Sequence, residues 1–208
     1  NRKFNFWFTM RYLSLLLTAF CIVNYTFSQK TENEIVEIRK DHKLLLLDST
    51  QNMLTSQEIA KFNGLDYFEF DSEFQIEAKF KKKKGKKFEM ATSTDRKPFY
   101  RRYGYLYFTI DGVDCKLEVY QNIALKRNPE YKNYLFIPFK DGTSALTTYG
   151  GGRFMDVERT KEKTILIDFN LAYNPYCVYS YRYSCPIPPK CNTLKVDIRA
   201  GEKTPIGH

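Results

Sequence analysis

Two stretches in the second half of the chain contain the residues best suited to binding a ligand. The first runs from Lys140 to Asp156 and contains three consecutive glycines followed directly by Arg153. The backbone amides of such glycines could form an anion-binding nest, and a guanidinium offers a planar fork for carboxylate or phosphate. The stretch is not a nucleotide-binding phosphate loop, because the Gly-Lys-Ser/Thr ending is absent. In the alternative interpretation, Arg153 forms a structural ion pair with Asp141, Asp156 or Asp168.

The second stretch runs from Asp168 to Cys177 and combines acid, amide, proline and aromatic residues. We expect both stretches to fold onto one pocket that binds a small anionic ligand or substrate. The alternative is a non-catalytic envelope protein in which the same Arg, Asp and Cys residues only stabilise the fold. The candidate ligand-binding residues are Asp141, Thr143, Tyr149, Gly150, Gly151, Gly152, Arg153, Asp168, Asn170, Tyr173, Asn174 and Cys177.

Histidine, the side chain most often used for acid–base catalysis, is nearly absent. His42 falls in an expected helix and His208 is the last residue of the sequence, so a nucleophile paired with histidine has little support. Any acid–base catalysis would depend on Asp141, Asp168, Glu202 or a tyrosine. No cofactor is expected. No metal site is expected either, because the cysteines lack both a Cys-x-x-Cys spacing and a nearby histidine.

The first 28 residues have the pattern of a secretory signal. Met10 and Arg11 precede an apolar run that ends in the small residue Ser28, where we expect cleavage, with residues 1–9 as an upstream extension. The run is too short and too rich in polar residues to favour a membrane anchor. We therefore expect an exported protein, periplasmic or secreted, with a single domain over residues 29–208. Removal of three basic residues would lower the net charge from +9 to +6.

Much of the positive charge lies in the segment Lys81–Lys87, where six of seven residues are lysines. The favoured interpretation is a solvated hairpin tip. The alternative is attachment to an anionic membrane surface. Nucleic acid is not an expected partner, because no aromatic residues that could stack on bases are interleaved with these lysines.

Hydrophobic periodicity predicts the elements that must position these residues. A helix is expected over residues 31–47, and a second short helix should begin at Thr55, whose hydroxyl can cap the amide of Glu58. Asp111-Gly112 is a strong hairpin signal. Short strands are expected over residues 74–80, 88–92, 105–110, 113–119, 134–139, 164–169 and 194–199. With no alternating βαβ rhythm, this series predicts a mainly β fold, an antiparallel sandwich or barrel-like domain with short N-terminal helices.

A set of short motifs resembles one prokaryotic family, the domain of unknown function 1684, over roughly residues 40–203. The resemblance implies no reaction, since the family has no assigned function. This chain departs from the usual family pattern at Lys190-Cys191, where an acid is common, and at Asn52-Met53. The motifs are Phe62 to Phe68, Tyr103-Gly104, Pro138 to Ser144, Thr148 to Arg153, Asp168 to Asn170, Ala172 to Pro175, Cys177, Cys185-Pro186, Pro188-Pro189, Asn192 and Ala200 to Glu202.

Export would place the cysteines in an oxidising compartment, and Cys177 and Cys185 are then a plausible disulfide pair. Closing this short loop would stabilise the fold by about 2.5 kcal/mol in the chain-entropy model. Family relatives often lack an export signal. If their equivalent cysteines are reduced, the pair serves packing or site chemistry instead.

Overall fold

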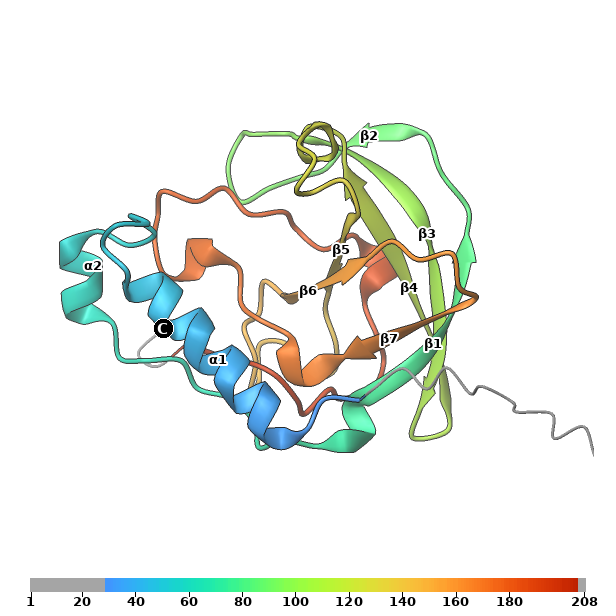
Figure 1. Cartoon of the computed structure of the whole chain (residues 1–208), viewed down its shortest axis with the longest axis horizontal. Coiled ribbons are helices and arrows are strands. Elements are labelled where there is room, and N and C mark those ends of the chain that lie inside the picture. Colours follow the sequence, from blue (N-terminus) through green and yellow to red (C-terminus); the bar gives the residue numbers. More distant parts are fainter. Residues whose placement is uncertain (1–28, 206–208) are drawn as a thin grey trace, which may run out of the picture.

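The computed structural model describes residues 29–205 and forms one curled antiparallel sheet with helices against it (Figure 1). The predicted signal sequence and its cleavage after Ser28 lie outside the described residues. Within residues 29–205, no helix is both long enough and apolar enough to cross a bilayer. The helices are α1 (Glu32–Leu47) and α2 (Ser56–Lys61), and the strands are β1 (Gln75–Lys82), β2 (Lys87–Glu89), β3 (Phe99–Ile110), β4 (Val113–Asn122), β5 (Tyr134–Phe139), β6 (Arg153–Glu158) and β7 (Thr164–Asp168).

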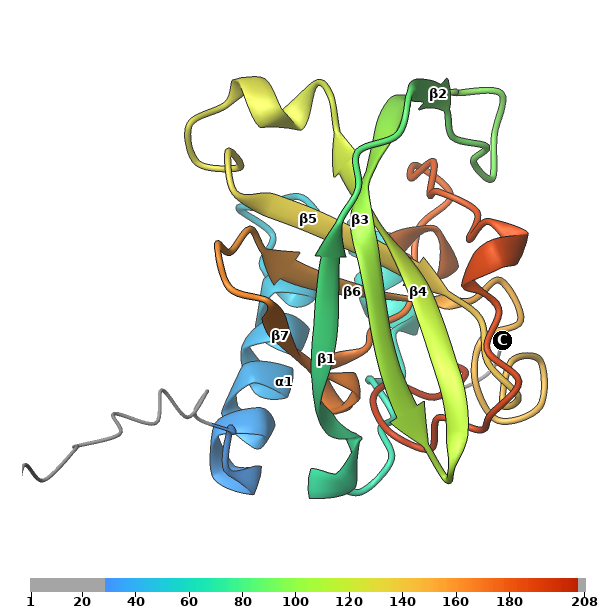
Figure 2. The same ribbon diagram turned by 90° about the vertical axis from the view of Figure 1, so that its right-hand side faces the viewer.

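The sheet has the order β6-β5-β4-β3-β1-β7, with β2 also paired to β3, and its neighbours are antiparallel. It curls as a half-barrel, so that β6 and β7 approach each other although they lie at opposite ends of this order (Figure 2). An isolated antiparallel bridge between Phe154 and Tyr173 joins β6 to the segment that follows β7. The predicted mainly β, antiparallel, barrel-like fold with short N-terminal helices is confirmed.

Local signals place several elements correctly. Thr31 and Thr55 both close capping boxes, with Glu34 and Glu58 respectively, and thereby start the two helices. The predicted turn between β3 and β4 is formed by Asp111 and Gly112, whose positive φ angles of 50° and 74° match the twist of the hairpin.

The lysine-rich segment Lys81–Lys87 is not the predicted hairpin tip. β1 pairs with β3 through Lys82 and Gly104, and β2 then pairs with the same strand through Lys87 and Arg101. Since both are antiparallel to β3, the chain continues in one direction along a single edge and is only interrupted between the two strands. The amides of Lys83 and Gly85 keep contact with β3 through the carbonyls of Tyr103 and Arg102.

Two further expectations about strands were wrong. Residues 153–158, which are not among the expected strands, form β6 because they pair with β5 over six positions. Residues 194–199, expected to form a strand, do not belong to the sheet. Their alternation is real, since Leu194, Val196 and Ile198 are buried. The backbone of the segment lies beside residues 140–142, where the Leu194 amide donates to the Lys140 carbonyl and the Gly142 amide donates to the Val196 carbonyl, both at 2.8 Å.

Each face of the sheet packs against its own hydrophobic cluster. The concave face encloses the main core, which includes Leu106, Leu117, Ile137 and Phe169. A second, aromatic cluster on the opposite face covers β4, β5 and β6. Its buried members are Met90, Tyr100, Tyr120, Phe136, Phe154 and Cys185. The segment after β7, which contains the 3-10 turns η3 (Phe169–Leu171), η4 (Tyr176–Val178) and η5 (Lys190–Asn192), passes from one face to the other.

Candidate functional site

Strand β6 contains both Arg153 and Asp156, the charged groups at the end of the first candidate stretch, and directs them to opposite faces of the sheet. Side chains alternate between the faces of a strand. Met155 therefore joins the main core, on the side of Arg153, whereas Phe154 joins the aromatic cluster. Asp156 follows Phe154 on that second face and lines a cleft there. Arg153 and Asp156 consequently belong to different environments, and no ion pair joins them.

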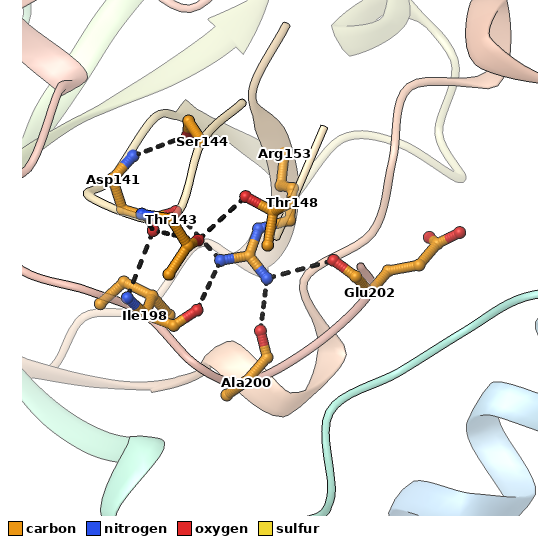
Figure 3. Close-up of polar contacts among 8 residues, drawn as sticks. All are labelled: Asp141, Thr143, Ser144, Thr148, Arg153, Ile198, Ala200 and Glu202. Carbon is orange, nitrogen blue, oxygen red and sulfur yellow. Dashed lines mark hydrogen bonds and ion pairs between the residues drawn. The ribbon is translucent and has the colours of Figure 1, made fainter. Parts of the chain in front are cut away.

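The guanidinium of Arg153 is enclosed by the chain itself, with 1% of the residue exposed (Figure 3). Its Nη2 donates to Asp141 Oδ2 at 3.0 Å and to the Ile198 carbonyl at 2.9 Å. Its Nη1 donates to the carbonyls of Ala200 and Glu202. Burial lowers the pKa of Arg153, and the neighbouring Asp141 opposes that shift. This placement differs from the expected anion-binding role, because these donors are already used internally, and it favours the structural alternative.

Asp141 and Thr143 complete this internal network. Asp141 Oδ1 accepts from the amides of Thr143 at 2.8 Å and Ile198 at 3.2 Å. The Thr143 hydroxyl also lies 2.9 Å from that of Thr148, and all of these side chains are buried. Both predicted site residues therefore support Arg153 instead of facing a ligand.

The triple-glycine segment makes a tight turn onto β5. Gly152 has a φ of +94°, and an added Cβ would lie 2.5 Å from the Phe139 carbonyl, so only glycine fits there. Its amide donates to Tyr149 O at 3.0 Å. Gly150 accepts from Lys140 Nζ at 2.8 Å, and Gly151 packs against the ring of Tyr149. Close packing explains these glycines without a bound anion.

Asn170 and Asp168 hold the turn after β7. The Asn170 side chain exchanges two hydrogen bonds with the backbone of Asp71, at 2.8 and 3.0 Å. Asp168 accepts from the Asn170 amide at 3.0 Å and from Gln75 Nε2 at 2.8 Å. Asn170 is completely buried, so both residues position the chain.

Asn174 forms a second buried network, with Glu202. The Asn174 amide donates to Glu202 Oε2 at 2.8 Å, and its Nδ2 donates to the Lys203 carbonyl at 2.7 Å. The hydroxyl of Tyr179 donates to the other Glu202 oxygen. Burial raises the pKa of Glu202 to about 7, although these hydrogen bonds act in the opposite direction.

Cys177 and Cys185 are free thiols in this structure, and their disulfide stays a prediction. The two residues are nevertheless in contact: the Cys177 amide donates to Cys185 Sγ at 3.2 Å. The hydrogen bond between the thiols lowers the pKa of Cys177 and raises that of Cys185. Among the described residues, no group of three His, Cys, Asp or Glu side chains is arranged to hold a metal ion.

Tyr173, one of the predicted site residues, lines an open cleft beside α1. The cleft lies between α1 and the second face of β6 and has a volume of about 270 Å³. Its walls come from the N-terminal helix, the segment before β1, β6 and the turns after β7. The lining residues are Ile38, Arg39, His42, Tyr67, Asp156, Leu171, Tyr173 and Tyr176.

Asp156 supplies the carboxylate of this cleft. Its Oδ1 accepts from Tyr134 at 2.8 Å and its Oδ2 from Tyr173 at 2.9 Å. The residue is open to solvent, but protein atoms surround its carboxylate on the remaining sides, as expected inside a concave site. Desolvation raises the pKa of Asp156, and the two tyrosine hydrogen bonds oppose this shift. Each carboxylate oxygen keeps lone pairs that a ligand could use.

His42 contributes a neutral imidazole beside this carboxylate. Burial lowers its pKa, so the ring carries no charge at neutral pH. Nδ1 lies 3.4 Å from the Tyr67 hydroxyl, whereas Nε2 is buried and has no hydrogen-bond partner among the described residues. The ring contacts Tyr173 and Tyr176 at centroid distances of 5.8 and 6.0 Å. Imidazole and phenol rings thus form an aromatic wall.

Arg39 fixes α1 above the cleft. Its Nε and Nη2 donate to the Asn170 carbonyl at 3.3 and 3.0 Å, and its Nη1 donates to the Phe68 carbonyl at 3.0 Å. The guanidinium carbon also lies 4.6 Å from the centroid of the Tyr67 ring. Arg39 is therefore a positioning residue that joins the helix to two loops.

A family model described as "Protein of unknown function (DUF1684)" matches residues 60–203. The chain belongs to this family. A solution NMR structure of an uncharacterised protein from Haloarcula marismortui is similar to it, with a TM-score of 0.64 and 30% sequence identity. That match covers 85% of this chain and 96% of the other. No curated protein matches the chain.

In this DUF1684 chain, sequence reasoning missed most of the cleft. Asp156 was considered only as a structural partner of Arg153, and His42 was set aside as a helix residue. Arg39, Tyr67 and Tyr176 were not singled out. Two signals could have found them. The alternation of β6 opposes Asp156 to Arg153, and the one-turn spacing of Arg39 and His42 puts both on one side of α1.

Proposed function

We propose that the cleft binds a small organic cation, such as a primary amine or a quaternary ammonium group, with Asp156 as its anchor. The observation that carries this proposal is a solvent-open carboxylate beside three tyrosine rings, those of Tyr67, Tyr173 and Tyr176. Aromatic faces attract cations through the ring quadrupole, and a carboxylate adds a charge-assisted hydrogen bond. The volume of about 270 Å³ suits a small metabolite.

The charges around the cleft favour a cation over the anion expected from the sequence. Arg153 is enclosed elsewhere, and Arg39 directs three donors to backbone carbonyls. His42 is neutral because burial lowers its pKa. An anionic ligand would also meet the Asp156 carboxylate, which costs free energy through like-charge repulsion. A cation finds Asp156, the carboxylate of the cleft lining, which is open to solvent.

The test is calorimetric titration of choline, ethylamine and putrescine, with acetate as the anionic comparison. We expect Asp156→Asn to weaken amine binding at least tenfold, about 1.4 kcal/mol, because the amide keeps the shape but loses the charge. Asp114→Asn, which changes an exposed carboxylate on β4, is the matched control and should bind as wild type does. Equal affinities in wild type and Asp156→Asn, or preferential binding of acetate, would reject the proposal.

A second candidate function is acid–base catalysis in the same cleft. One observation favours it: Asp156 and His42 line one cavity, and burial raises the pKa of the acid while it lowers that of the base. Nε2 of His42 is unpartnered among the described residues and could accept a proton. His42→Gln should then retain amine binding yet lose turnover of an aryl ester probe. If His42→Gln and Asp156→Asn both hydrolyse the probe at the wild-type rate, the cleft binds amines without catalysing a reaction.

We also propose that the protein is exported and that Cys177 and Cys185 are oxidised to a disulfide after export. The signal pattern before Gln29 and the contact of the Cys177 amide with Cys185 Sγ support this proposal. N-terminal sequencing of protein recovered outside the cytoplasm should begin at Gln29. Its mass should rise by about two hydrogens on reduction. An uncleaved chain would contradict the proposed export, and an unchanged mass on reduction would contradict the proposed disulfide.

A further inference from the structure

Three cations surround one buried tyrosine on β3. Tyr103 is 1% exposed, and its ring is stacked on Phe80 with a centroid distance of 6.1 Å and an interplanar angle of 9°. Lys82 Nζ, Lys84 Nζ and the Arg159 guanidinium carbon lie 5.5, 5.7 and 5.4 Å from the same ring centroid. Arg159 Nε also donates to the Tyr103 hydroxyl at 3.0 Å. Tyr103 therefore gathers positive charge from two distant parts of the chain.

A groove of about 670 Å³ opens at this cluster and adds two more lysines, Lys161 and Lys163. The segment after β6 comes beside β1 here, because the Phe80 amide donates to the Lys163 carbonyl at 2.7 Å. We call this feature the basic groove. Its lining residues are Phe80, Lys82, Tyr103, Asn133, Arg159, Thr160, Lys161, Glu162 and Lys163.

The cations of the basic groove form no ion pair within the described residues, although the carboxylate of Glu162 also lines the groove and offsets one of its four positive charges. Within residues 29–205, none of Lys82, Lys84, Arg159, Lys161 and Lys163 forms an ion pair with a carboxylate. Elsewhere the chain does pair its arginines, as with Arg102 and Glu118 at 3.2 Å. Like charges held around one ring repel one another, so their free energy falls when an anion joins them.

We propose that the basic groove binds a polyanion of the phosphate or sulfate type, whose oxygens contact Lys82, Arg159 and Lys163. The concave shape and the fixed guanidinium of Arg159 suit a compact group with several anionic oxygens. Single-stranded nucleic acid fits less well, since the Tyr103 ring is buried and cannot stack on a base. This site is separate from the Asp156 cleft and takes a ligand of opposite charge.

The test is calorimetric titration of the full chain with tripolyphosphate. Lys82→Gln/Lys163→Gln should weaken binding about tenfold, because two groove charges are lost. The control Lys126→Gln/Lys195→Gln removes the same charge from exposed lysines outside the groove and should weaken binding less than about twofold. Equal weakening by the two pairs, or no wild-type binding at about 1 mM tripolyphosphate, would overturn the proposal. Matching thermal unfolding of all variants confirms that they are folded.

A second arm distinguishes the source of the anion. Phosphatidylcholine vesicles with a phosphoinositide present the same chemistry on a lipid surface. Cosedimentation that is lost in the groove variant and competed by tripolyphosphate would identify a lipid headgroup. Tripolyphosphate binding without vesicle binding would identify a soluble anion. Both outcomes support the groove, whereas vesicle binding that persists undiminished in the groove variant would count against it.

Discussion

Arg39 and Arg153 are buried to different extents, and their side chains have different roles. Arg39 lies half-buried at the edge of a cleft, where it holds a helix in place, whereas Arg153 is sealed among four acceptors of its own chain. A buried cation is tolerated only when such acceptors offset its lost hydration. Removing one partner of such an arrangement costs more than the arrangement itself contributes.

We predict that Arg153→Met destabilises the protein by about 3–5 kcal/mol, because the Asp141 carboxylate is then buried without its cation. The free energy of unfolding from urea denaturation measures this. The matched control is Arg199→Gln, which removes an exposed ion pair with Asp197 and should cost about 0–1 kcal/mol. A loss below about 1 kcal/mol for Arg153→Met would show that the network is dispensable.

For individual residues, the sequence predicted local motifs such as helix caps and turns, but it did not predict the cleft beside Asp156. The capping box of Thr55 and the turn at Asp111-Gly112 depend on neighbours within four residues, so their residue types suffice. The roles of Arg153 and Asp156 depend on which face of β6 each occupies. Because no strand was expected over residues 153–158, the sequence did not predict that these two side chains point to opposite faces.

Gly104 decides how β1 and β3 fit together at the element scale. A Cβ built at this position would lie 2.6 Å from the Phe80 ring and 2.7 Å from the Lys81 carbonyl. The ladder between β3 and β4 also shifts register beside it. Glycine thus lets the Phe80 ring cross β3 and stack on Tyr103.

We predict that Gly104→Ala lowers the free energy of unfolding by about 1–3 kcal/mol, since the ring or the strand must move. Gly85→Ala is the matched control. Its Cβ would meet only the Arg102 side chain at an ordinary 3.5 Å, so we expect a change within about 0.5 kcal/mol. Equal stability of the two variants would contradict the packing argument. The comparison requires only thermal or chemical denaturation.

Element types were predicted better than element partners. The β-rich runs were found from their alternation, yet the segment Lys81–Lys87 was assigned to a hairpin because lysines and glycine favour turns. The alternation of residues 194–199 likewise predicted a strand of the sheet, whereas this segment makes scattered backbone hydrogen bonds to residues 140–142 and belongs to no named strand. Periodicity reports which side chains are buried, and it does not report which backbone lies beside them.

At the scale of the whole molecule, Glu202 should make stability depend on pH. Burial raises its pKa from 4.5 to about 7. Between these values the folded chain keeps a proton that the unfolded chain has released, so the free energy of unfolding falls as pH rises and levels off above pH 7. For this completely buried group the fall is about 3 kcal/mol.

Urea denaturation at pH 5 and pH 8 checks this expectation in wild type and in Glu202→Gln. The amide cannot ionise, so the variant should lose about 2.5 kcal/mol less between the two pH values than wild type does, because a small part of the fall already occurs below pH 5. Other groups titrate in both proteins alike and cancel in the comparison. If the two proteins show the same difference between pH 5 and pH 8, Glu202 does not govern the dependence.

The curl of the sheet could not be predicted from strand propensity. It depends on β5 pairing with β6 and on the Phe154–Tyr173 bridge, both of which join segments that no local pattern relates. The cleft beside Asp156 is lined by residues of α1, β6 and η4 together, so it depends on this tertiary arrangement. The family resemblance, expected over about residues 40–203 and shown over residues 60–203, carried no geometry.

The positions of the Arg153 acceptors in the sequence also determine when this hydrogen-bond network can form during synthesis. Three of them lie 45, 47 and 49 residues further along the chain, at Ile198, Ala200 and Glu202. At 5–20 residues per second, a ribosome delivers them about 2–10 s after the arginine itself. During that delay the cation stays hydrated, so β6 cannot seal against its final neighbours. The network around Arg153 can therefore close only after residues 198–202 have been synthesised.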